Sequence, residues 1–399
     1  MGREKLVALA REHVEYALEY ERSGKNVLAD DVFRIPVTNY FDPDRWEAEM
    51  DLIFKRVPLV LGFSVEIPKA GDYKAMEVAG VPLILVRGRD GIVRGFVNMC
   101  SHRGAQIVDN GNSSTRSFSC PYHAWTYNLT GDLVAILDDQ DFGEVDTSCM
   151  GLTPLNVEER VGILWGSITP GNDLHLNEFL AGYDEYLESH DLVNCELVGQ
   201  QTVEGPNWKV AYDGYLDFYH LPILHKDTFG PDYNNKSIFD NWGAHQRVQA
   251  PDHRLLDLAD LPEEEWSHTK LVSGVWTIFP HISIASFDAG GHIYMISQLF
   301  PGSDPDTSIT HQNFLATFTP TEEQKESIAQ TMDFLRYVVA EEDYYTGNRI
   351  QKTVKTGAKS HFYFGRNEEG GQRFHRWTDA LVQADSEEDL LLLYKKGVG

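Results

Sequence analysis

Apolar and polar residues follow different periods in different parts of the chain. Residues 1–25 alternate charged and apolar side chains at the spacing of an amphipathic helix, and Asp42 with Pro43 supplies the N-cap and first position of a second helix. From Val57 to about Ile168 the pattern changes to short apolar segments separated by turns that contain Gly and Asp. This middle stretch predicts a small antiparallel β domain.

The last part of the chain mixes strand and helix patterns. Residues 272–301 alternate as strands do, and residues 314–319 add another strand. Residues 321–324 have the form of a capping box and open a long helix that passes Asp343. The apolar stripe of this helix consists of Ile328, Met332, Leu335 and Val339. A strand-rich sheet flanked by helices is the α+β pattern.

These patterns predict how the chain divides. Residues 51–168 are expected to form the small antiparallel β domain, and residues 169–399 a larger domain with a central antiparallel sheet flanked by helices. Residues 1–50 are expected to form N-terminal helices that pack with the larger domain.

The excess of acidic over basic residues limits the kinds of molecule that we expect this protein to bind. The chain of 399 residues has 34 basic and 61 acidic side chains, a net charge of −27. A surface this acidic repels phosphate backbones, which argues against nucleic acid as a partner. It can attract a basic patch on an electron-donor protein, and plain solubility explains it equally well.

The N-terminus is too charged for a secretory signal, and no apolar run approaches the ~20 residues of a membrane helix. We therefore expect a cytoplasmic protein that does not enter the membrane. In that reducing compartment Cys149 and Cys195 are expected to be unpaired thiols.

The other two cysteines each lie beside a histidine. Cys100 is followed by His102, and Cys120 by His123. In a Rieske [2Fe–2S] centre two cysteines bind one iron and two histidines bind the other, so each loop would supply one ligand to each iron. A structural zinc site accepts the same ligand types, but zinc sites usually pair like with like. The mixed pairs favour a Rieske cluster, with zinc as the alternative.

The residues around both pairs resemble a known family. Asn-Met-Cys-Ser-His-Arg-Gly-Ala-Gln at 98–106 and Phe-Ser-Cys-Pro-Tyr-His-Ala-Trp-Thr-Tyr at 118–127 are similar to the Rieske loops of aromatic-ring-hydroxylating oxygenase large (α) subunits. Ala124 stands where that family usually has Gly. The resemblance makes residues 51–168 a Rieske domain and residues 169–399 a catalytic domain with mononuclear iron.

A second cluster of metal-binding side chains follows Asn207-Trp-Lys. On a continuous helix Asp213, Asp217 and His220 would share one face. A bend at Pro222 would bring His225 beside His220. Two imidazoles and one carboxylate form the facial triad of non-haem Fe(II) oxygenases, whereas the alternative is ordinary buried histidines hydrogen-bonded to carboxylates.

This segment also resembles the family, in its Asn-Trp-Lys opening and its Asp-x-x-His-x4-His arrangement. The resemblance implies that His220 and His225 bind iron. It implies that Asp217 links a ligand histidine to a Rieske histidine, here His123, of the neighbouring subunit.

The third iron ligand has to come from elsewhere in the chain. The segment 341–343 looks like the family's Glu-Asp pair, so Asp343 is expected to bind iron, with Glu342 as the second candidate. The alternative is a solvated acidic helix face.

Apolar and aromatic side chains near these residues are candidates for a substrate pocket, although side chains at such spacing are more often plain core. His281 falls where the family often has Asn, and it could hydrogen-bond a polar substituent of the substrate. The candidates are Tyr215, Leu216, Leu221, Trp276, His281 and Phe287.

The resemblance covers nearly the whole chain and implies the terminal oxygenase of an aromatic-ring-hydroxylating system. Electrons would come from NAD(P)H through a ferredoxin, a flavin reductase or both, and pass by the [2Fe–2S] cluster to Fe(II), where O₂ is activated. The family forms homotrimers, with or without a separate β subunit. The expected reaction is dihydroxylation of a small aromatic substrate, as in aromatic hydrocarbon catabolism. The alternatives are monooxygenation or O- or N-demethylation at a non-ring position, and, more remotely, a pure Rieske electron carrier.

Overall fold

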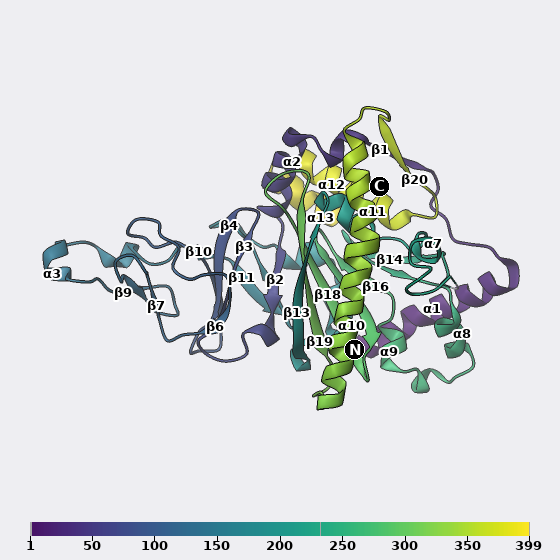
Figure 1. The fold of residues 1–399 in the computed structure, drawn as a ribbon, viewed down its shortest axis with the longest axis horizontal. Helices are drawn as coiled ribbons and strands as arrows, with labels where there is room; N and C mark the ends of the chain where they lie inside the picture. The colour runs from purple at the N-terminus through teal and green to yellow at the C-terminus, as the bar shows by residue number, and fades with distance from the viewer. Residues whose placement is uncertain (1, 232, 399) are drawn as a thin grey trace. The chain divides into compact units, whose positions relative to one another are not determined.

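Short strands dominate the stretch Phe54–Leu176, which forms one of two compact units in the computed structural model (Figure 1). The structure describes residues 2–231 and 233–398. The strands expected between residues 57 and 97 are present and pair antiparallel. Their bounds are β2 Leu59–Phe63, β3 Asp72–Val78, β4 Val81–Arg87, β5 Val93–Val97, β6 Gly111–Ser114, β7 Phe118–Ser119, β8 Thr126–Tyr127, β9 Leu133–Ala135, β10 Pro154–Leu155, β11 Val157–Arg160 and β12 Ile163–Gly166.

These strands form small sheets in the order β10-β5-β4-β3-β6, β11-β12-β2 and β7-β8-β9 among the described residues. One short helix, α3 Asp139–Phe142, follows β9. The core of this unit contains both cluster cysteines together with the buried rings of Phe118, Trp125 and Tyr127. The two cysteine loops are therefore anchored in the packed interior of the unit.

The other unit is built on a seven-stranded antiparallel sheet in the order β13-β19-β18-β17-β16-β15-β14. A separate pair, β1 with β20, brings residues near the N- and C-termini together. The strand bounds are β1 Phe33–Pro36, β13 Glu196–Gly205, β14 Ile238–Trp242, β15 His245–Gln249, β16 Val275–Ile278, β17 Ile282–Asp288, β18 His292–Pro301, β19 Ser308–Ala316 and β20 His361–Phe364.

Helices pack on this sheet, which confirms the expected α+β fold with a central antiparallel sheet. The N-terminal helices belong to the same unit as this sheet. The helix bounds are α1 Gly2–Ser23, α2 Pro43–Glu49, α4 Leu176–Leu180, α5 Asp184–Leu187, α6 Trp208–Asp213, α7 Leu221–Leu224, α8 His253–Ala259, α9 His268–Leu271, α10 Glu322–Tyr337, α11 Tyr344–Val354, α12 Glu369–Gln383 and α13 Glu387–Lys396.

The long helix predicted after Thr321 is present and runs across one face of the sheet (Figure 1). Thr321 caps α10 and forms the expected capping box with Gln324. A π-helical turn, Val338–Asp343, joins α10 to α11 without ending the helix. Among the described residues, no helix is both long and apolar enough to cross a membrane.

Successive side chains of a strand point to opposite faces of the sheet, so the two faces have different surroundings. In the register of β17 and β18, Ser283 lies opposite Ser297 and Ala285 opposite Met295. These residues share the face toward α10, whereas Trp276 on β16 points to the other face and packs against Tyr183.

Candidate metal centres

The two cysteine loops have the same construction. In the first, the Cys100 N–H donates to the Ala105 carbonyl at 2.8 Å, and in the second the Cys120 N–H donates to the Trp125 carbonyl at 2.8 Å. Gly104 and Ala124 occupy matching positions with φ of 75° and 55°. Ala124 thus takes a left-handed conformation that glycine adopts at lower cost, which explains why a Gly is the usual residue there.

The loops bring together the side chains that a Rieske cluster needs. Cys100 and Cys120 are 2% and 4% exposed, whereas the His102 and His123 rings lie farther out with centroids 4.7 Å apart. The Nδ1 atom of His102 is buried and has no hydrogen-bond partner among the described residues. Two inner thiols, two outer imidazoles and an unpartnered ring nitrogen fit a [2Fe–2S] cluster with one iron bound by sulfur and one by nitrogen.

Aromatic rings enclose this site. His102 stacks on Trp125 with centroids 4.8 Å apart, and Phe142 meets the edges of both rings. The Tyr127 hydroxyl lies 3.2 Å from the Cys100 sulfur, where it can donate a hydrogen bond to a thiolate. Such contacts and the exclusion of water tune the reduction potential of a Rieske cluster.

The second site corrects one expectation about the segment after Asn207. A continuous helix would place Asp213, Asp217 and His220 on one face, but α6 ends at Asp213 and the next helix begins at Leu221. Asp213 instead accepts hydrogen bonds from the Tyr40 hydroxyl at 2.7 Å and from His375 Nε2 at 2.9 Å. The helical period does not extend through Gly214 and the following turn, so only Asp217 stays with His220.

The chain does not bend at Pro222 as expected, because Leu221 and Pro222 instead open the short helix α7. Pro222 is in the first turn of α7, and His220 and His225 flank this short helix as its N-cap and C-cap. Their ring centroids lie 5.3 Å apart.

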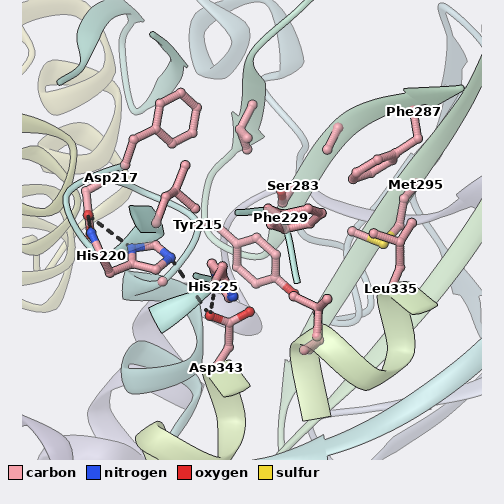
Figure 2. Close-up of a pocket in the computed structure, with 17 residues that line it drawn as sticks. Tyr215, Asp217, His220, His225, Phe229, Ser283, Phe287, Met295, Leu335 and Asp343 are labelled. Atoms are coloured by element: carbon pink, nitrogen blue, oxygen red, sulfur yellow. Dashed lines mark hydrogen bonds and ion pairs between the residues drawn. The ribbon is translucent and has the colours of Figure 1, made fainter. Parts of the chain in front are cut away.

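Asp343 faces both histidines (Figure 2). Its Oδ1 atom lies 3.2 Å from His225 Nε2 and 3.8 Å from His220 Nε2. One ligand atom from each residue lies within 4.8 Å of the others. The π-helical turn before α11 ends at Asp343 and orients this carboxylate toward the histidines.

The other ring nitrogens are held by further carboxylates. His220 Nδ1 donates to Asp217 Oδ1 at 3.1 Å, and His225 Nδ1 donates to Glu342 Oε2 at 2.7 Å. Thr228 also donates to Glu342 Oε2, at 2.8 Å. Both Nε2 atoms are therefore left facing Asp343, which is how ligand histidines are usually oriented by outer carboxylates.

The carboxylates around the triad also favour binding of a cation. Burial lowers the pKa of His220 and His225, but the neighbouring carboxylates, Asp217 for His220 and Asp343 with Glu342 for His225, outweigh it and raise the pKa of both histidines. Two imidazoles and one carboxylate with outer carboxylate support fit Fe(II), which binds such triads with positions left open. Glu342, the second candidate for the third ligand, orients His225 in this geometry.

A cavity of about 110 Å³ opens beside the triad. Its lining is apolar apart from the triad, Asp217 and a few hydroxyls. It is lined by Gly214, Tyr215, Asp217, Phe218, His220, Leu221, His225, Phe229, Val275, Ser283, Ala285, Phe287, Met295, Leu335, Val338, Val339 and Asp343.

Of the pocket residues that the sequence suggested, Tyr215, Leu221 and Phe287 line this cavity. The structure places Leu216, Trp276 and His281 elsewhere. Trp276 alternates with Val275, which does face the cavity, and Leu216 is buried with its carbonyl against Gly370.

His281 is fully buried, and its ring packs on Phe300 with centroids 4.7 Å apart. The idea that His281 hydrogen-bonds a substrate is therefore not supported by its position.

Several residues around the site were not anticipated. Phe229 follows His225 by four residues, and this spacing in a helical turn could have indicated it. Ser283 and Met295 come from β17 and β18, which pair as a hairpin, and the two glycines in the turn at 289–291 are a signal that could have indicated this pairing. The link from Asp213 to His375 joins residues 162 positions apart and has no local signal.

Comparison with protein families identifies both units. A model described as "Rieske [2Fe-2S] domain" matches residues 58–143, and one described as "Ring hydroxylating alpha subunit (catalytic domain)" matches residues 192–384. The chain is 28% identical over 348 residues to the carnitine monooxygenase oxygenase subunit of Escherichia coli K12, which covers 84% of this chain and 87% of that protein.

Two further relatives match less than half of this chain, and one is named as a monooxygenase subunit and the other as a dioxygenase subunit. The glycine betaine monooxygenase oxygenase subunit of Chromohalobacter salexigens is 33% identical over 48% of this chain and 43% of its own length. The biphenyl 2,3-dioxygenase subunit alpha of Rhodococcus jostii is 32% identical over 45% of this chain and 41% of its own length.

Solved structures share the fold. A quaternary ammonium Rieske monooxygenase in complex with L-carnitine superposes with a TM-score of 0.72, 21% identity and coverage of 88% of this chain and 96% of that one. Naphthalene 1,2-dioxygenase with indole bound superposes with a TM-score of 0.75, 18% identity and coverage of 93% and 97%.

Proposed function

The chain belongs to the Rieske oxygenase α subunits, and from this membership we propose that it hydroxylates a carbon outside an aromatic ring of a small organic substrate, as a monooxygenase. It is a Rieske-type oxygenase, the terminal component of its system. The observation that carries the proposal is the group His220, His225 and Asp343 at the wall of an apolar cavity. That arrangement combines a three-ligand iron site with space for a substrate.

We assign each metal to the group of side chains that provides suitable ligand atoms. Cys100, His102, Cys120 and His123 would hold a [2Fe–2S] cluster. The triad would hold Fe(II), and together these groups supply electron transfer and O₂ activation when bound. The protein contributes the geometry: carboxylates orient both histidines, and the apolar walls exclude water from the cavity.

Asp217 is proposed as the electron relay. Its Oδ1 atom accepts from His220 Nδ1, and its side chain remains 17% exposed, so one carboxylate oxygen can meet a second donor. We propose that this donor is His123 of a second copy of the chain in a homotrimer. A carboxylate that joins two ligand imidazoles fixes their orientation and shortens the path between them.

The relatives support a reaction at a non-ring position better than ring dihydroxylation, which the sequence favoured. The match that spans most of the chain is to a monooxygenase subunit. Ring dihydroxylation stays the second candidate because the cavity lining is mostly apolar and aromatic, and because part of the chain matches a biphenyl dioxygenase. The relatives are named as oxygenase subunits, which supports a separate reductase, with or without a ferredoxin, that oxidises NAD(P)H.

Turnover under ¹⁸O₂ separates the two reactions. The protein, supplied with a reductase and NADH, is screened against methylated amines, aryl ethers and simple arenes, and the products are analysed by mass spectrometry. We expect one ¹⁸O atom per product, or per aldehyde released by demethylation before exchange. Two ¹⁸O atoms in a cis-diol would favour ring dihydroxylation, and no oxygenated product with any class would contradict the proposal.

A further inference from the structure

In the described part of the chain, the cavity beside the triad has no Lys or Arg side chain to pair with an anion. Two carboxylates, Asp217 and Asp343, belong to the lining, and Glu342 stands directly behind His225. With neutral imidazoles, these three carboxylates exceed the two charges of a bound divalent iron, so the loaded site keeps a net negative charge.

A carboxylate on a substrate would be poorly accommodated in this setting. It would lose its hydration on entering an apolar cavity and would meet three protein carboxylates without a cationic partner. The net charge of −27 on the whole chain adds to this repulsion. Neutral and cationic molecules do not suffer the same penalty.

Two side chains of the cavity lining, Tyr215 and Ser283, have a buried hydroxyl without a hydrogen-bond partner among the described residues, and Ser283 is the smaller of the two. Ser283 is 2% exposed, and its Oγ atom has no hydrogen-bond partner among the described residues. It lines the cavity from β17, on the side away from Asp217 (Figure 2). Ser297 lies directly opposite it on β18 and is 1% exposed, so two hydroxyl side chains face the same way at this point of the sheet.

A buried hydroxyl without a partner is costly unless a ligand or water satisfies it. Ser283 can both donate and accept, which suits an alcohol, ether or carbonyl oxygen. Neutral hydroxyls do not supply the positive charge that a carboxylate needs.

We propose that the substrate of this oxygenase carries no carboxylate and presents one uncharged oxygen-containing group to Ser283. This inference rests on the proposed function, because it names the substrate class of the same site. It sets the chain apart from the relatives named for carnitine and glycine betaine, since both of those molecules carry a carboxylate. Overall similarity to those relatives would thus mislead about the substrate.

Two matched ligand pairs test the inference by binding alone. Choline and glycine betaine share a trimethylammonium group and differ in an alcohol against a carboxylate. Benzyl alcohol and benzoate differ in the same way on an aromatic ring. Calorimetric titration of the iron-loaded holoenzyme without O₂ should show at least one alcohol binding at least about tenfold more tightly than its carboxylate partner.

Single substitutions test which residues cause the preference for an alcohol over a carboxylate. Ser283→Ala should weaken binding of the preferred alcohol about two- to tenfold and leave the carboxylate unchanged. Ser286→Ala is the matched control, because Ser286 is on the same strand but is not part of the lining. Ala285→Arg, which places a cation in the lining, should improve binding of the carboxylate member.

Tighter binding of either carboxylate than of its alcohol would overturn the inference, and so would the failure of both alcohols to bind. Unchanged affinity in Ser283→Ala would remove the role of that hydroxyl. Because no turnover is measured, these results are independent of the ¹⁸O₂ experiment. An alcohol preference without any oxygenated product would leave this inference standing while contradicting the proposed function.

Discussion

Each histidine of the iron triad uses both ring nitrogens. His220 and His225 direct Nε2 toward Asp343, while Nδ1 donates to Asp217 or Glu342. The two neighbouring acidic residues 342 and 343 therefore have different tasks, one orienting a histidine and the other completing the triad. This division can be tested at single residues.

Asp343→Ala should lose the mononuclear iron and keep the cluster, because it removes a ligand without touching the cysteine loops. The expected result is about one iron fewer per chain with unchanged acid-labile sulfide. Glu341→Ala is the control, since Glu341 is an exposed neighbour. Metal analysis that finds full iron in Asp343→Ala would transfer the ligand role to Glu342.

Asp217→Asn should retain both metal sites and lose turnover. The amide keeps the size of the side chain but weakens the hydrogen bonds that orient the two imidazoles, and losses of about 10- to 100-fold or more in activity are expected. Steady-state turnover and metal content are measured on the same sample. Normal activity at normal iron content would exclude the relay.

Local sequence was enough to predict some of these residues. Cys100, His102, Cys120 and His123 lie in two short loops, and His220 and His225 in another, so their spacing alone suggests ligands. The choice between Glu342 and Asp343 depends on the rotation of one helical turn. Adjacent helix positions point about 100° apart, and the sequence contains no signal for the π-helical turn that sets this rotation.

Strand pairing and the alternation of side chains along each strand decide which residues reach the site. Ser283 and Met295 reach the cavity because β17 pairs with β18, while the alternation of β16 sends Trp276 to the opposite face. Strand existence was predicted from the alternation, but which face meets the triad was not. The helix expected through Asp213 ended early, so apparent helical periodicity overestimated its length.

Helix α6 is held in place by a buried ion pair with α2. Glu49 and Lys209 are both 0% exposed and form a salt bridge, and Glu49 also accepts from Trp208 Nε1 at 2.9 Å and Arg45 Nε at 2.7 Å. Burial lowers the pKa of Lys209 despite the raising effect of Glu49. The pair links the N-terminal helices to the segment that precedes the iron ligands.

Lys209→Met should destabilise the larger unit by about 3 kcal/mol, because it leaves a buried carboxylate with fewer partners. Chemical denaturation followed by circular dichroism measures the change. The double variant Lys209→Met with Glu49→Gln should recover part of the loss. Equal stability of Lys209→Met and the wild type would show that the ion pair contributes little.

For the whole molecule, the fold class was predicted correctly because the helical spacing and the strand alternation of apolar residues are both strong in the sequence. The order of the seven strands was not predicted, since β13 pairs with β19 across more than a hundred residues. Long-range pairing of this kind depends on tertiary packing rather than on local propensity.

Stability should depend on pH through histidines that the fold keeps neutral. Burial lowers the pKa of His190 to about 3, of His245 to about 4 and of His281 to about 3. In the unfolded chain such groups titrate near pH 6.5, so below that pH the unfolded state binds more protons and folding is disfavoured. Between pH 6.5 and 5.5 each should cost about 1 kcal/mol.

Denaturation midpoints at the two pH values measure this loss. His245→Gln should reduce it by about 1 kcal/mol, and the exposed His361→Gln should not change it. Stability that is constant or rises toward pH 5.5 would contradict neutral burial of these histidines.

We propose that one chain holds a Rieske cluster and a separate mononuclear iron. Iron and acid-labile sulfide analysis of anaerobically purified protein, with EPR of the reduced state, tests it most directly. We expect about three iron and two sulfide per chain with a Rieske signal. Zinc without sulfide, or two iron that stay at two after incubation with Fe(II), would contradict it.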